Sequence, residues 1–159
     1  MRIEYKNKFS DILLFNAVHQ FLSPVLQGFY LLFFALFLFS GLMDDSASAV
    51  AAATTAILWY LGLWLIQFVF NAFYLFSRKN KSVLTTHIVE IQDDAFFEET
   101  QFNKSFFYWP GIVKAVSRPG FVAVYVTPHM AHIVPNRAFS SKDQKHQFLA
   151  LLREKMGAA

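Results

Sequence analysis

The chain has 159 residues, of which 55% are hydrophobic and 16% are charged, and its formal net charge is +3. Globular chains are usually about 45–50% apolar and about 25% charged, so this composition is unusually apolar. A positive charge this weak, with no long basic run, gives no support for nucleic-acid binding. The chain has no cysteine, which excludes disulfides and thiolate chemistry.

The first part of the chain predicts a membrane hairpin. Residues 12–43 and 46–77 contain no Asp, Glu, Lys or Arg. A membrane span needs only about 20 apolar residues. We therefore predict two transmembrane helices, at about residues 24–42 and 50–73, joined by a short polar loop.

A separate helix is expected before the first span. Over residues 10–23, polar side chains recur at helical spacing and share one face, while apolar residues cover the remainder; the polar set is Asn16, His19, Gln20 and Ser23. This pattern is typical of a helix that lies in the membrane interface. Ser23 and Pro24 then provide an N-cap and a first helical residue, so a new helix begins there.

The positive charges predict the topology. Arg2, Lys6 and Lys8 precede the first span, residues 78–81 carry three more basic residues, and the loop between the spans has none. Both termini are therefore expected in the cytoplasm and the loop outside. The small residues at 46–49 could suggest a signal-peptide cleavage site, but the apolar stretch before them is too long and starts too late.

Residues 83–157 predict a small cytoplasmic α+β domain, with residues 1–77 forming the membrane part. Short β-like runs separated by turns suggest about five antiparallel strands in meander order; they cover residues 83–91, 95–102, 106–117, 121–127 and 131–134. Ser141 and Gln144 form a capping-box pair that begins a C-terminal amphipathic helix. A bent antiparallel sheet closed by such a helix suggests a pleckstrin-homology-like arrangement.

No catalytic or metal site is predicted. His129 and His132 straddle a turn and have no carboxylate nearby in sequence to complete a metal site. The pairs Asp93-Asp94 and Glu98-Glu99 place neighbours on opposite faces of a strand, so we interpret them as solvated. We expect no enzyme activity and no cofactor.

Amide side chains lie inside the predicted spans. Gln27 and Asn71 fall at similar predicted depth, and each is costly to leave unpaired in hydrocarbon. We expect them to face each other or to share a contact with Gln67. None of these groups is ionisable, which favours helix packing over transport.

The soluble part offers a weak basic candidate surface. Its members are Lys104, Lys114, Arg118 and Arg137. A short linker would keep them close to the inner leaflet, where each well-placed cation contributes about 1 kcal/mol of attraction to anionic lipid.

Several motifs together resemble the YcxB-like family of bacterial membrane proteins. They are Trp109 and Ile112 in "YWPGIVKA", and Ile133, Pro135, Arg137 and Phe139 in "IVPNRAF". The resemblance implies a pleckstrin-homology-like domain on a helical hairpin in the bacterial inner membrane, and it implies no particular activity. Asn136 departs from the family pattern, where a basic residue is common, and Pro110-Gly111 should bend the strand. We interpret "IVPNRAFSS" as a structural corner in which Phe139 packs beneath the last helix.

The sequence thus predicts a membrane-anchored, non-catalytic binding or scaffold protein. Its partners would be membrane lipid, another protein or a second copy of itself. The alternative is an immunity or accessory protein that acts on another membrane protein through its spans, and an enzyme or transporter is a third hypothesis.

Overall fold

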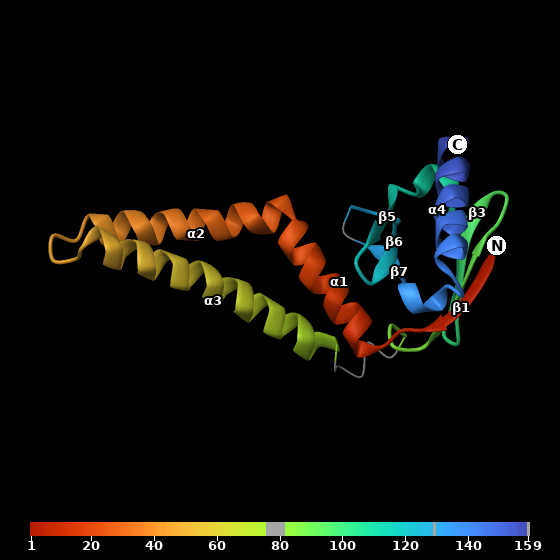
Figure 1. Ribbon diagram of the computed structural model, residues 1–159, viewed down its shortest axis with the longest axis horizontal. Coiled ribbons are helices and arrows are strands. Elements are labelled where there is room, and N and C mark those ends of the chain that lie inside the picture. The colour runs from red at the N-terminus through yellow and green to blue at the C-terminus, as the bar shows by residue number, and fades with distance from the viewer. Residues whose placement is uncertain (76–81, 129, 159) are drawn as a thin grey trace. The chain divides into compact units, whose positions relative to one another are not determined.

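The computed structural model describes residues 1–75, 82–128 and 130–158, in two compact units (Figure 1). One unit contains residues 16–76, and the other combines residues 1–15 with residues 77–159. The predicted fold class is confirmed: a helical hairpin precedes an α+β domain with antiparallel sheets and a C-terminal helix.

The hairpin consists of α2 (Pro24–Leu42) and α3 (Ala49–Leu75), which lie side by side (Figure 1). Both helices are long and apolar enough to cross a membrane. Ser23 caps α2 as predicted, because its hydroxyl accepts from the Leu26 amide at 3.5 Å. Near the connecting loop the backbones approach so closely that a Cβ on Gly41 would lie 2.8 Å from the Ala52 Cβ.

The strands form two antiparallel sheets. Sheet A has the order β1-β2-β3-β4 and sheet B the order β5-β6-β7. Their bounds are β1 Arg2–Lys6, β2 Thr86–Ile91, β3 Ala95–Thr100, β4 Lys104–Tyr108, β5 Lys114–Arg118, β6 Phe121–Tyr125 and β7 Ala131–Pro135.

The expected single strand over residues 106–117 is therefore wrong. Pro110 and Gly111 lie in a 3-10 turn, η2 (Trp109–Gly111), that separates β4 from β5. Proline cannot donate to a strand ladder and fixes its own φ, so the chain leaves sheet A there and enters sheet B.

A further strand that the sequence did not predict, β1, lies at the N-terminus. β1 pairs with β2 although the whole hairpin separates them in sequence, and Ile3 and Tyr5 are buried. The N-terminal residues, which the sequence grouped with the membrane part, are thus integral to the α+β unit.

Helices cover the sheets. The C-terminal α4 (Lys142–Gly157) packs against β5 and η2, and it buries Phe148, Leu149 and Leu152. Ser141 caps it as predicted, accepting from the Gln144 amide at 3.1 Å. The first half of α1 (Phe9–Leu22) belongs to this unit as well.

The packing of α1 differs from the expected interfacial helix. Phe15 meets Phe121 and Tyr125 of β6, at ring-centroid distances of 5.7 and 6.4 Å. Apolar residues that were expected to face lipid thus cover a sheet. The boundary between the two units falls within this helix, after Phe15.

The motif residues build the corner after β7. Pro135 ends that strand, and residues 136–138 form a second 3-10 turn, η3 (Asn136–Ala138). Phe139 is buried edge-on against Phe148 at 5.4 Å. Trp109, Ile112 and Ile133 are buried too, and the Trp109 indole donates to the Asp93 carbonyl at 2.9 Å.

Candidate functional site

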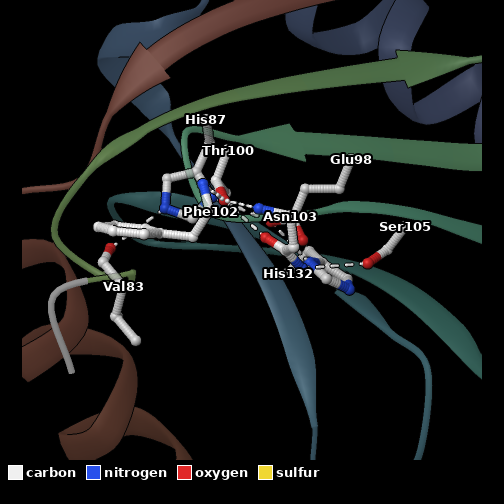
Figure 2. Close-up of polar contacts among 8 residues, drawn as sticks. All are labelled: Val83, His87, Glu98, Thr100, Phe102, Asn103, Ser105 and His132. Atoms are coloured by element: carbon white, nitrogen blue, oxygen red, sulfur yellow. Dashed lines mark hydrogen bonds and ion pairs between the residues drawn. The ribbon is translucent and has the colours of Figure 1, made fainter. Parts of the chain in front are cut away.

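A buried carboxylate joins two histidines between the sheets. Oε1 of Glu98 lies 2.9 Å from Nδ1 of His87 and 2.9 Å from Nδ1 of His132 (Figure 2). The three side chains come from β2, β3 and β7. His87 and Glu98 are only 7% and 8% exposed, so this cluster is part of the interior.

Strand alternation explains the burial. His87 precedes Val89 and Ile91 on the inward face of β2, and Glu98 lies opposite Val89 in the register. The prediction that Glu98 is solvated is therefore wrong, because its position in sheet A points it at sheet B. The period-two pattern of "HIVEI" was the available signal for His87.

The electrostatics favour an ionised carboxylate. Burial by itself raises the pKa of Glu98, but hydrogen bonds from His132 and His87 and their charge outweigh it and lower the pKa to about 2. Burial, together with the negative charge of Glu98, raises the pKa of Tyr5. The Tyr5 ring stacks on His87 at 5.6 Å.

A pocket of about 310 Å³ opens beside the cluster. Its volume is at the lower end of the range of small-ligand sites, about 300–1,000 Å³. The wall is mixed, with apolar side chains around the titratable ones; it consists of Asn7, Ile12, Ser82, Val83, His87, Glu98, Thr100, Asn103, Met130, Ala131, His132 and Ile133. It lies at the end of β2 and β3 away from Asp93, the residue that Lys155 of α4 contacts at 2.8 Å.

Aromatic and polar side chains lie around the buried carboxylate. The described residues contain no group of three or more His, Cys, Asp or Glu placed to hold a metal ion. His132 contacts Glu98 and lies against the Phe96 and Phe107 rings, whereas His129 lies outside the described residues. Asn103 and Thr100 bond to each other at 2.6 Å (Figure 2).

The basic candidate residues lie on several elements and have internal contacts. Lys104 on β4 pairs with Glu99 at 2.8 Å, and the Lys114 ammonium lies 4.6 Å from the centre of the Tyr125 ring. Arg118 ends β5. Arg137 pairs with Asp11 and donates to the Lys6 carbonyl, so it ties η3 to the last residue of β1 and the first turn of α1.

Only part of the expected amide arrangement is present: Asn71 contacts Gln67, but Gln27 contacts neither of them. Gln27 accepts from the Tyr60 hydroxyl at 2.7 Å and donates to the Gln20 carbonyl at 3.0 Å. Gln67 donates to Asn71 within α3 at 3.4 Å. Gln20, expected on a polar surface, is buried and donates to the Tyr30 hydroxyl and the Trp64 carbonyl.

The unequal lengths of α2 and α3 explain why Gln27 does not meet Asn71. α3 has 27 residues and α2 has 19. At 1.5 Å per residue, α3 is therefore longer by about 12 Å. Residues near the start of α2 are level with Tyr60, and Asn71 lies further along α3.

Comparison with known proteins gives a match that lies in the C-terminal half of the chain. Residues 91–152 match the family model described as YcxB-like protein, whereas the chain matches no curated protein and no solved structure. The matched region begins at the last residue of β2 and includes β3 to β7 and most of α4. The segment from residue 91 to residue 152 is therefore similar to the YcxB-like family.

Proposed function

We propose that this protein is a membrane-anchored, non-catalytic binding protein whose C-terminal domain recognises a protein partner on the cytoplasmic side of the bacterial inner membrane. The anchor would be α2 and α3. Large apolar side chains such as Leu32, Phe39 and Phe70 are more than half exposed on them, and lipid would cover this surface. The basic residues on both flanks support cytoplasmic termini.

The strand order supports a pleckstrin-homology-like domain. Four antiparallel strands are followed by three, and α4 packs against the second sheet. In this chain the hairpin would be an insertion between β1 and β2, because these two strands pair directly.

The observation that carries the proposal is the pocket beside Glu98. Apolar wall residues surround a few convergent polar groups, as in binding sites generally. Within the described part of the chain, the polar side chains there bond mainly to one another, which favours recognition over catalysis. Internal contacts of Lys104 and Arg137 make a protein partner a better candidate than an anionic lipid surface.

The test is co-purification of the tagged full chain in a mild detergent. Met130, 63% exposed, lines the pocket, and Phe106, 56% exposed on β4, does not. We expect Met130→Asp to lose a partner that Phe106→Asp retains. Equal recovery from both variants, or no partner with the wild-type chain, would contradict the proposal.

A second candidate function acts through the hairpin. Leu31, Phe34, Ile57 and Tyr60 line an apolar hollow of about 210 Å³ between α2 and α3. An accessory or immunity protein could use it to hold a side chain from the helix of another membrane protein. Loss of the co-purified partner in Leu31→Ala with Ile57→Ala, but not in Met130→Asp, would favour this function.

A further inference from the structure

His87 lies between two hydrogen-bond acceptors. Nδ1 faces the Glu98 carboxylate at 2.9 Å, and Nε2 faces the main-chain carbonyl of Val83 at 3.2 Å (Figure 2). A neutral imidazole carries one N–H, so it can donate to only one of them. The other nitrogen would then point a lone pair at an oxygen. The doubly protonated ring satisfies both contacts.

The Glu98 carboxylate supplies a negative charge beside this ring. The titratable groups that meet this ring are Glu98 on β3 and Tyr5 on β1, and His132 on β7 shares the carboxylate. Glu98 is held ionised, and an ionised carboxylate this deeply buried needs a counter-charge. His132 needs only its Nδ1–H for its contact with Glu98, whereas both ring nitrogens of His87 face an oxygen.

Val83 occupies a position where this bond matters. It lies in the turn before β2 and, with Ser82, lines the pocket. Among the bonds of the described residues, the Asn7 amide also donates to the Thr85 carbonyl, at 3.3 Å. The His87–Val83 contact thus joins the turn before β2 to a side chain of sheet A.

We propose that protonated His87 is a latch: its Nε2–H holds the Val83 carbonyl, and loss of that proton releases residues 82–84 and reshapes the wall of the pocket. The pocket would thus respond to pH through a single proton. The effect on partner binding rests on the proposed function, but the latch itself does not.

The latch can be tested without any partner, on the full chain in lipid nanodiscs. Ring ¹⁵N and ¹³C signals of His87 and the Val83 carbonyl shift would be followed from about pH 5.5 to pH 9. We expect both to change with one midpoint. Amide exchange at residues 83–85, corrected for intrinsic rates, should rise about tenfold, the loss expected for one hydrogen bond to a charged group.

Two variants sharpen the test. In His87→Gln the exchange at residues 83–85 should no longer depend on pH. His146→Gln changes an exposed residue of α4 and should respond like the wild type. The wild-type titration decides the question even if His87→Gln does not fold. A His87 ring that keeps one protonation state throughout, or that loses its proton while Val83 stays unmoved, would overturn the latch. Partner recovery at each pH is a separate readout that tests the proposed function.

Discussion

The Glu98 carboxylate contributes to stability only while it is ionised. Its pKa falls from 4.5 to about 2 in the folded chain, so its contribution is full above pH 4.5 and disappears as the pH falls towards 2. Removing one partner of a buried charged pair typically costs about 3–5 kcal/mol. We expect Glu98→Gln to lower the free energy of unfolding by about 3 kcal/mol at neutral pH, and the difference should shrink between pH 4.5 and pH 2.

Thermal unfolding followed by circular dichroism in detergent would measure this difference. Glu99→Gln is the matched control, because the neighbouring carboxylate pairs with exposed Lys104 on the other face of the strand. Equal destabilisation by the two variants at neutral pH would show that the histidines do not hold the carboxylate.

Phe139 and Arg137 differ in what they contribute to the corner. Truncating a buried Phe typically costs about 3–5 kcal/mol, so Phe139→Ala should strongly destabilise the α+β unit. The Arg137–Asp11 pair is partly solvated, and such pairs contribute about 0–1 kcal/mol. Arg137→Ala should therefore stay folded. Chemical denaturation would compare the two variants, and similar midpoints would contradict the corner interpretation.

At the scale of elements, the hairpin depends on small residues near its loop. Gly41→Ala should weaken it, because the added Cβ would meet the Cβ and Cα of Ala52 at 2.8 and 3.0 Å. Gly28→Ala in the same helix is the control, since nothing lies within 4 Å of the position that its new methyl group would occupy. Alanine is a better helix former by about 1 kcal/mol, so this control should be neutral or stabilising.

The readout for both glycine variants is the unfolding midpoint of the helical signal in the same detergent. A decrease for Gly41→Ala alone would confirm that α2 and α3 meet there. A decrease of similar size for Gly28→Ala would contradict it.

At the scale of the molecule, the chain crosses between its two units twice. The α+β unit takes β1 and the first half of α1 from one side of the hairpin and everything from β2 onward from the other side. We expect residues 82–159 alone to be unstable, because Ile3 and Tyr5 are missing from the core. Joining residues 1–15 to residues 82–159 by a short Gly/Ser linker should restore folding.

Far-UV circular dichroism and dispersed amide resonances would report on both fragments. As a matched control, the linked fragment with Ile3→Asp should behave like residues 82–159 alone. Cooperative folding of residues 82–159 without β1 would contradict this account.

The sequence by itself determined the features that rest on local chemistry. Charge-free stretches predicted the two long helices, and Ser23-Pro24 and Ser141 with Gln144 predicted helix starts. These signals act over a few residues, so the sequence near them is sufficient.

Tertiary structure alone decided what depends on distant pairing. The β1–β2 pairing joins residues on both sides of the hairpin, and no local signal reports it. Glu98 looked like a solvated acid in sequence, and it became a buried partner only because β2, β3 and β7 bring His87 and His132 to it. A buried charge is stable only with partners, and the fold determines which side chains lie close enough to pair with it.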